Sequence, residues 1–317
     1  MHPFPAVIDN TMRSDYFDCK RKFFWSFIRQ LGPLEPSADL HAGGAFAAGQ
    51  EAIRNAFYRD GLSVSDSFKE GMTRTMEYWG EYEVPGHKEH KDLSRVLGAL
   101  GYYYQVWPLG SDKLKPLVLQ GKPSVEFSFA IPLPIDHPET GEPLIYAGRS
   151  DMIAEYGGSL YVEDDKTATQ LGPTWPGKWD MRSQFTGYVY AARTIAQLPV
   201  AGVIVRGISF LKNGYGSAEA ISSRPQWFID LWYHQLLRDV TGMIQNWREG
   251  YWDYALNDAC EAYGGCPFKK LCLTPNPESW IEGSYSTRIW NPLEKNPLAI
   301  TPSQVPESGQ LPEGVRS

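Results

Sequence analysis

The sequence predicts an α/β fold in which a helix is followed by three antiparallel strands, a second helix and a fourth strand. Three observations lead to this prediction. Residues 125–133 (VEFSFAIPL) alternate between apolar and polar side chains, as a half-buried strand does. The pair Gly157-Gly158 separates two further apolar runs and is typical of a tight hairpin turn. Residues 200–211 (VAGVIVRGISFL) are rich in β-branched side chains and indicate a buried strand.

Helices are expected ahead of these strands. The first begins at Asn10 or Thr11, either of which can cap it, and presents an apolar face as far as about Phe27. The other N-terminal helices are expected over residues 43–58, 66–80 and 93–107. The first of these three is rich in small residues, which permits close packing against a neighbour.

The remaining elements follow in order. Strands are expected over 144–156 and 159–167, on either side of the Gly157-Gly158 turn, and Asp180 can cap a helix over 181–196. A long amphipathic helix is expected over 226–249, and the Pro-rich segment after Pro275 is interpreted as an extended tail. The chain is divided accordingly into an N-terminal helical part, a central core, a C-terminal helix with cysteines, and a tail: 1–110, 111–225, 226–275 and 276–317.

The composition is that of a globular protein. The chain has 317 residues, of which 42% are hydrophobic and 14% aromatic, enough to bury a substantial core. No run reaches the roughly 18 to 20 apolar residues of a membrane span, and the first residues lack the order of a signal peptide, so a cytoplasmic location is expected. A net charge of -7 argues weakly against a non-specific nucleic-acid coat protein. A local basic groove, or a divalent metal held by carboxylates, can outweigh a distant acidic surface.

The segment LYVEDDKTATQ, residues 160–170, places three acids and a lysine at the end of an apolar run. Because side chains alternate along a strand, Asp164 and Lys166 share one face. Counting across the glycine turn pairs Asp151 with Asp164, which brings their Cβ atoms to about 5 Å from each other. Two adjacent carboxylates repel unless a cation lies between them, and Mg²⁺ or Mn²⁺ is the natural occupant. Lys166 then presents an ammonium group beside the metal.

A solvated hairpin end is the alternative interpretation of this acidic segment. Asp151 argues against it, because it lies in an otherwise apolar strand, where an unpaired acid is costly to bury.

The pattern resembles the PD-(D/E)XK nuclease superfamily and, within it, the RecB-like and CRISPR-associated exonucleases. The resemblance rests on G-x-x-D at residues 148–151, D-x-K-T at 164–167, and Q-x-x-x-Y at Gln184 and Tyr188. It implies the nuclease core of this superfamily, with Asp151 and Asp164 as ligands of Mg²⁺ or Mn²⁺ and Lys166 as the catalytic lysine. Gln184 and Tyr188 lie four apart on one helix face, where they can bind a DNA phosphate or position Lys166.

One part of the family pattern is missing. Members commonly have a metal-binding histidine on the first core helix, and Ala48 stands at about that position. Glu51 is the candidate replacement ligand, with an exposed helix residue as the alternative interpretation. His41, near the start of the helix, is interpreted as structural.

Four cysteines, Cys19, Cys260, Cys266 and Cys272, form a second set of candidates. From the residues alone, thiols so spaced suit a structural Zn²⁺ or an iron-sulfur cluster, or remain unligated. The resemblance implies a [4Fe-4S] cluster, because the related exonucleases use one cysteine before the core and three after it. The cluster would tie the N-terminal helical part to the C-terminal one.

The resemblance implies a metal-dependent DNA exonuclease that hydrolyses phosphodiester bonds during recombination or replication. It also implies a helicase or recombination protein as a partner. The compact form is similar to that of exonucleases encoded by bacteriophages. Lysines and arginines beside the cysteines are expected to form a basic rim for DNA: Lys20, Arg21, Lys22, Lys269 and Lys270. The alternative is a catalytically silent DNA-binding or scaffold protein that retains the fold, which the missing histidine favours.

Overall fold

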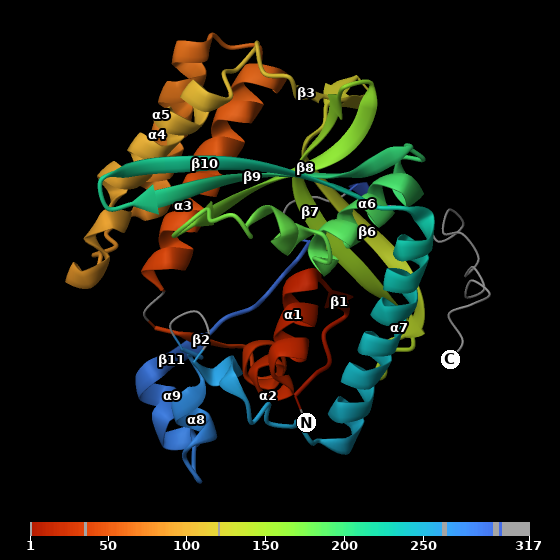
Figure 1. Cartoon of the computed structure of the whole chain (residues 1–317). Coiled ribbons are helices and arrows are strands. Elements are labelled where there is room, and N and C mark those ends of the chain that lie inside the picture. The colour runs from red at the N-terminus through yellow and green to blue at the C-terminus, as the bar shows by residue number, and fades with distance from the viewer. Residues whose placement is uncertain (1, 35–36, 120, 262–264, 294–297, 300–317) are drawn as a thin grey trace. The chain divides into compact units, whose positions relative to one another are not determined.

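The computed structural model describes residues 2–34, 37–119, 121–261, 265–293 and 298–299 (Figure 1). The chain divides into two compact units. The first comprises Met1–Glu35, Ser128–Gly148 and Trp227–Ser317, and the second comprises Pro36–Phe127 and Arg149–Gln226. Each unit is assembled from segments far apart in the sequence, whereas the four parts expected above are consecutive. That fourfold division remains a prediction.

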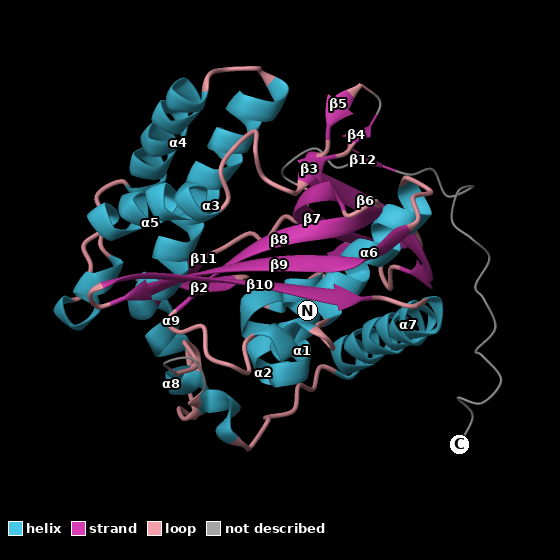
Figure 2. Ribbon diagram, turned by 45° about the horizontal axis from the view of Figure 1, so that its top comes forward, coloured by secondary structure: helices cyan, strands magenta, loops and turns pink. Residues whose placement is uncertain are grey.

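The second unit contains strands in the order β10 (Gly214–Ser223), β9 (Val200–Leu211), β8 (Ser159–Ala168) and the second half of β7 (Pro143–Tyr156) (Figure 2). The β7–β8 pair is antiparallel, with Met152 opposite Glu163, while β8 and β9 are parallel and β9 and β10 antiparallel. A mixed sheet within an α/β arrangement confirms the coarse prediction. β10 is absent from the sequence-based expectation, which passes directly from the strand at 200–211 to the next helix.

The helices of the second unit agree with the sequence to within a few residues. They are α3 (Ala38–Arg54), continued by a π-helical turn η2 (Asn55–Arg59), and α4 (Val64–Trp79), α5 (Leu93–Val106) and α6 (Ser183–Ile195). The expected cap of α6 is wrong. Arg182 is the N-cap residue, and Asp180 instead accepts a hydrogen bond from Ser222 Oγ at 2.8 Å.

Short elements complete the second unit. They are η3 (Gly86–Lys91), η4 (Pro176–Trp179), β3 (Lys115–Pro116), β4 (Val118–Leu119) and β5 (Lys122–Pro123). β3 pairs with β7, and β4 pairs with β5.

The core of the second unit lies where α3, α4 and α5 meet β9. Its buried side chains include Phe46, Ile53, Leu100, Tyr103 and Phe210. This apolar packing fixes α3 against the strands that carry the acidic segment.

The first unit begins with a helix that is interrupted, against expectation, at Cys19. α1 (Asn10–Asp18) is followed by α2 (Lys20–Phe23) and a π-helical turn η1 (Phe24–Ile28), and Cys19 itself has extended dihedral angles, φ -168° and ψ 118°. The cap also differs from the prediction. Asp9 is the N-cap residue of α1, and its carboxylate accepts a 2.8 Å hydrogen bond from the Met12 amide.

The strands of the first unit are β1 (Val7–Ile8), β2 (Leu31–Pro33), β6 (Val125–Asp136), the first half of β7, β11 (Tyr285–Thr287) and β12 (Leu298–Ala299). β6 begins at Val125, three residues before the segment Ser128–Gly148 of the first unit. β7 continues past Gly148, so its second half belongs to the second unit. β1 pairs with β7, β12 with β6, and β11 with β2.

The helices of the C-terminal part are α7 (Gln226–Glu249), η5 (Asp258–Cys260), α8 (Lys269–Cys272) and α9 (Glu278–Ser284). α7 is joined to α1 by a buried ion pair between Arg13 and Asp239 at 2.5 Å. The expected extended tail instead begins with α9 and β11, and residues 294–297 and 300–317 lie outside the described residues. Among the described helices, none combines the length and apolar character required to cross a membrane.

Candidate active site

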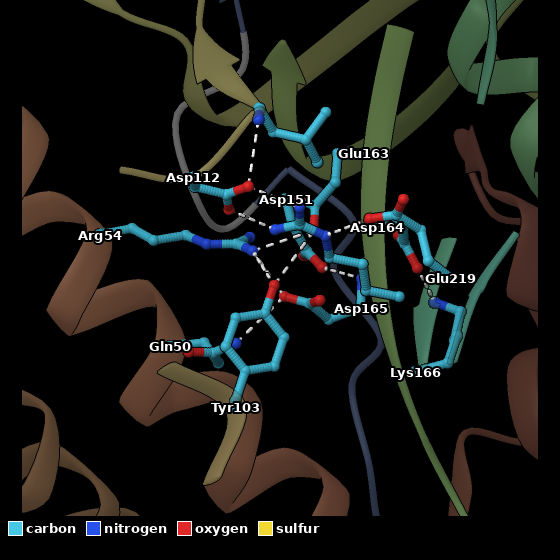
Figure 3. A network of polar contacts seen from close by, with 12 residues as sticks. Gln50, Arg54, Tyr103, Asp112, Asp151, Glu163, Asp164, Asp165, Lys166 and Glu219 are labelled. Atoms are coloured by element: carbon cyan, nitrogen blue, oxygen red, sulfur yellow. Dashed lines mark hydrogen bonds and ion pairs between the residues drawn. The ribbon is translucent and has the colours of Figure 1, made fainter. Parts of the chain in front are cut away.

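The acidic segment of β8 presents its side chains to two different helices. Because consecutive residues of a strand point to opposite faces, Asp164 and Lys166 lie on one face, and Glu163 and Asp165 lie on the other. Figure 3 shows the two pairs turned apart around the strand. The segment is therefore two sites that must be considered separately.

Asp164 and Lys166 form an ion pair on the face that meets α6. The Lys166 ammonium contacts Asp164 Oδ1 and lies 5.5 Å from the centroid of the Phe185 ring. Asp164 is 3% exposed, and the Lys166 side chain retains 28% exposure. The face thus combines a buried carboxylate with a cation that solvent reaches.

Glu163 and Asp165 are held on the opposite face by Arg54 of α3. Arg54 Nη2 lies 3.0 Å from Glu163 Oε1 and 2.8 Å from Asp165 Oδ2, and it also donates to the Tyr103 hydroxyl at 2.9 Å. Gln50 adds a 3.2 Å hydrogen bond to Asp165. All of these charged side chains are at least nine-tenths buried, so the group is a fully enclosed ion-pair network.

Asp151, on the neighbouring strand β7, lies beside Glu163 and Asp165. In the antiparallel register Met152 faces Glu163, and Asp151 and Asp164 are the next residues along the two strands. Asp151 Oδ2 accepts a 2.7 Å hydrogen bond from the Asp165 backbone amide. One ligand oxygen from each of Asp151, Glu163 and Asp165 lies within 4.8 Å of the other two, so this acidic triad could hold a metal ion.

A further acidic pair, which the sequence analysis missed in part, adjoins Asp151. Arg149 lies 3.5 Å from Glu51 on α3 and 3.0 Å from Glu126 on β6. Glu126 has a left-handed backbone, φ 56°, which is strained for a residue with a side chain. The sequence signal for Glu126 was its position as a polar residue in the alternating run 125–133. Glu51 therefore lies near the acids but is paired with Arg149, and Ala48 contributes no ligand atom.

The pKa values reflect this concentration of buried acids. Burial raises the pKa of Asp164 to about 7, with Lys166 opposing the rise and Asp151 adding to it. Burial and the Asp151 charge raise the pKa of Glu126 to about 8. For Lys166, burial favours the neutral amine, but the charges of Asp164 and Asp151 outweigh it and raise the pKa. Lys166 is therefore an ammonium ion at neutral pH.

The comparisons with known proteins decide the family. A model of the PD-(D/E)XK nuclease superfamily matches residues 13–273. The chain belongs to the PD-(D/E)XK nuclease superfamily. The match includes Asp151 of β7 and Asp164 and Lys166 of β8.

Among solved structures, the chain is similar to a "Putative exonuclease" from Eubacterium rectale, with 10% identity and a TM-score of 0.42, over 81% of this chain and 88% of that one. It is also similar to a protein named SSO0001, with 14% identity and a TM-score of 0.29, over 66% of this chain and 80% of that one. At these scores the likenesses add nothing about the chemistry of this chain. A search of curated protein sequences finds no significant match.

The Q-x-x-x-Y residues of this PD-(D/E)XK protein lie on α6. Gln184 Nε2 donates to the Tyr188 hydroxyl at 2.8 Å, so the two side chains form one unit. α6 reaches the catalytic lysine candidate through Phe185, the residue that follows Gln184. His41, by contrast, hydrogen-bonds the Trp79 carbonyl at 3.2 Å and stacks on Tyr82 at 4.0 Å. These contacts agree with a structural role for His41.

The four cysteines of the PD-(D/E)XK chain all lie in the first unit and line one cavity of about 320 Å³. Within the described residues, no three of their sulfurs approach within 4.8 Å of one another. The thiols are thus not gathered as tightly as a single ion requires, although they share one cavity. None of them forms a disulfide.

The basic rim expected around the cysteines is largely neutralised. Lys20 pairs with Asp253 at 2.6 Å, Lys22 with Asp15 at 2.7 Å, and Lys269 with Glu261. Paired surface lysines offer little charge for phosphate binding. Asp253 lies 233 positions from Lys20 in the chain, so no local pattern reveals that pair, whereas Asp15 and Glu261 lie close in sequence to their lysines.

Proposed function

We propose that this PD-(D/E)XK protein is a metal-dependent DNA exonuclease of the RecB-like type, with a role in the processing of DNA ends during recombination or replication and a bacteriophage origin. The observation that supports the proposal is the contact of Lys166 with Asp164 beside Asp151. Phosphodiester hydrolysis requires carboxylates that can hold a divalent metal and a positive charge that stabilises the phosphate, and these residues can provide both.

Asp151 and Asp164 are the proposed ligands of Mg²⁺ or Mn²⁺. Their carboxylate oxygens are the donors that such hard cations prefer. Burial raises the pKa of Asp164, with the Asp151 charge adding to the rise, and a bound cation would favour the ionised carboxylate. When bound, such a metal polarises a phosphate oxygen and makes a coordinated water more acidic. Glu51 is the proposed additional ligand, after release from Arg149.

The alternative ligand set is the triad of Asp151, Glu163 and Asp165. Its oxygens are close enough, but Arg54 already contacts two of its three members. A divalent cation there would face a buried guanidinium that cannot lose its proton. On the Asp164 face the cation in contact is Lys166, whose long side chain can move aside.

Lys166, Gln184 and Tyr188 then act on the substrate. The Lys166 ammonium stabilises negative charge that develops on the phosphate, or holds the attacking water. Gln184 and Tyr188, joined by their hydrogen bond on α6, are the proposed residues that position the DNA strand on the same side as Lys166. Each of these roles depends on contacts with DNA.

The four cysteines are the proposed ligands of a [4Fe-4S] cluster. One Zn²⁺ would hold its thiolates about 3.8 Å apart, because Zn–S bonds are about 2.3 Å long, whereas a cluster of several atoms holds them farther apart. The support for a group shared by the four thiols is that all of them line one cavity. Its contribution would be structural, because it joins Cys19 to the segment that contains Cys260, Cys266 and Cys272.

The second candidate function is a catalytically silent DNA-binding or scaffold protein. Ala48 at the place of the family histidine favours it. Digestion of end-labelled single- and double-stranded DNA with Mn²⁺ distinguishes the two candidates. We expect Lys166→Ala to reduce cleavage by a factor of about 10² or more, while Lys69→Ala, a change of an exposed lysine on α4, leaves it unchanged. Equal digestion by wild type and Lys166→Ala would contradict the proposed catalytic role, and no metal-dependent digestion by the wild type would favour the silent protein.

A further inference from the structure

Arg149 lies on β7 two residues before Asp151, so the two side chains project from the same face of the strand. Its guanidinium contacts two carboxylates: Nε lies 3.0 Å from Glu126 Oε2 on β6, and Nη1 lies 3.5 Å from Glu51 Oε2 on α3. Burial and then the Asp151 charge raise the pKa of Glu126, so Asp151 lies near this group as well. Arg149 is therefore a cation among the acids of the proposed active site.

The ion pairs of Arg149 leave hydrogen-bonding groups unsatisfied. Within the described residues, neither its Nη1 nor Glu126 Oε2 forms a hydrogen bond, although both atoms are buried. Leaving a buried polar group without a hydrogen-bond partner costs about 1–3 kcal/mol. The guanidinium is thus held by charge attraction, and it retains donor capacity for a further anion.

Arg149 also differs in exposure from Arg54, the arginine bound to the acids of β8. The Arg54 side chain is 4% exposed, and its partners Glu163 and Asp165 are buried with it. The Arg149 side chain is 34% exposed, so solvent reaches it. The planar guanidinium presents its donors in a fork that matches two oxygens of one phosphate. A phosphate of DNA is therefore the anion that fits Arg149.

We propose that Arg149 binds a phosphate of the DNA strand at the active site, and that Glu51 keeps the guanidinium from DNA until Glu51 becomes a metal ligand. The inference rests on the proposed function, in which Glu51 leaves Arg149 for the metal. Transfer of this carboxylate removes one of the two negative charges in contact with the guanidinium, so its attraction for a phosphate increases. DNA binding by Arg149 is thereby coupled to occupation of the metal site.

Glu51→Gln reproduces the release of Arg149 without a metal. Binding is therefore measured in EDTA, in which a metal-dependent nuclease does not cleave, by the fluorescence anisotropy of a fluorescein-labelled oligonucleotide duplex with single-stranded ends. We expect Glu51→Gln to bind about tenfold more tightly than the wild type, the size of one hydrogen bond to a charged group. The gain should disappear in the double variant Glu51→Gln/Arg149→Gln, because a double-mutant cycle isolates the coupling of the two residues.

The salt dependence of binding separates a phosphate contact from a structural role. Loss of one contact should lower the slope of log affinity against log salt concentration by about 0.7–0.9 between Glu51→Gln and the double variant. Arg149→Lys in the Glu51→Gln background should restore the slope, because it retains a positive charge, but only part of the affinity, because an ammonium lacks the planar fork. Arg74→Gln in the same background is the matched control. Arg74 is exposed on α4 and pairs with Glu77 at 3.3 Å, so this change should leave affinity and slope as they are.

The outcomes distinguish this inference from the proposed function. If Glu51→Gln brings no gain, or the same gain with and without Arg149→Gln, the Arg149 inference is overturned. An equal salt slope in Glu51→Gln and the double variant also overturns it. In each case, metal-dependent digestion of DNA by the wild type leaves the proposed function standing. A wild type that neither binds the duplex, with or without Ca²⁺, nor digests DNA with Mn²⁺ overturns both.

Discussion

Asp164 and Asp165 are adjacent in β8, yet their carboxylates are bound by different cations on opposite faces of the strand. Asp164 contacts Lys166, whose side chain is partly exposed, and Asp165 lies 2.8 Å from the buried Arg54. The two adjacent acids therefore have different ion-pair partners and different solvent exposure. The Arg54 side of β8 is enclosed and suited to holding the strand on α3, while the Lys166 side is accessible and suited to chemistry.

Replacement of Arg54 tests the enclosed side. Arg54→Met leaves Glu163 and Asp165 buried without their cation, and removal of one partner of a buried ion pair costs about 3–5 kcal/mol. We expect this loss in the free energy of unfolding, measured with urea. Lys69→Met, which removes an exposed ion pair, should cost less than about 1 kcal/mol. A loss from Arg54→Met as small as that of the control would show that the network does not stabilise the fold.

Metal-induced stabilisation tests which acids bind the metal. At a Mn²⁺ concentration about 100 times the dissociation constant, binding should add about 2.7 kcal/mol to the stability of the wild type. We expect Asp151→Asn and Asp164→Asn to abolish this gain in a thermal-unfolding assay and Asp165→Asn to retain it. The reverse result, with the gain lost in Asp165→Asn and retained in Asp164→Asn, would assign the metal to the triad of Asp151, Glu163 and Asp165.

Close packing between α3 and α4 depends on two glycines. A Cβ atom at Gly71 would lie 2.2 Å from Ile53 Cγ1 and 3.0 Å from the Gly49 carbonyl oxygen. Gly71→Ala should therefore destabilise the protein by about 1–3 kcal/mol, as overpacked cores do. Gly101→Ala on α5 has no atom within 4 Å of the new Cβ and should be neutral or stabilising by up to about 1 kcal/mol. Chemical denaturation compares them, and equal effects would refute the packing explanation.

Asp9 makes a pH-dependent contribution to stability. Burial raises its pKa to about 6 from 3.8, although the Met12 amide and Trp290 oppose the rise. The folded protein therefore binds this proton more tightly than the unfolded chain, so the contribution is complete below about pH 4 and is lost as the pH rises through 6. Asp9→Asn keeps a residue suited to capping but has no charge to bury. Relative to the wild type, the variant should gain about 1–1.5 kcal/mol between pH 5 and pH 8 in urea unfolding. A difference between the two proteins that does not vary with pH would contradict this.

The sequence predicted those parts of the fold that depend on local patterns. The glycine turn at 157–158 and the alternation along β8 were sufficient to place Asp164 and Lys166 on one face, and helical periodicity located α3 to α6 to within a few residues. β10 was missed because its residues are mostly small and polar, although the Asn213-Gly214 dipeptide before it is a recognised hairpin signal.

Other parts depend on partners that no local pattern identifies. Arg54 is one charged residue on a helix, and nothing in the periodicity shows that it is enclosed by acids more than a hundred residues later. The left-handed backbone at Glu126 and the helix break at Cys19 are likewise not indicated by any local pattern. The roles of the individual site residues remain predictions, to be decided by the variants above.

The separation of Cys19 from the other three cysteines has a consequence for biosynthesis. The next cysteine, Cys260, follows 241 positions later in the chain. At about 5–20 residues per second, a ribosome needs roughly 12 to 48 s to reach it. During that interval the first thiol is on the nascent polypeptide without its partners, so the proposed cluster could form only in the final stage of translation or after release.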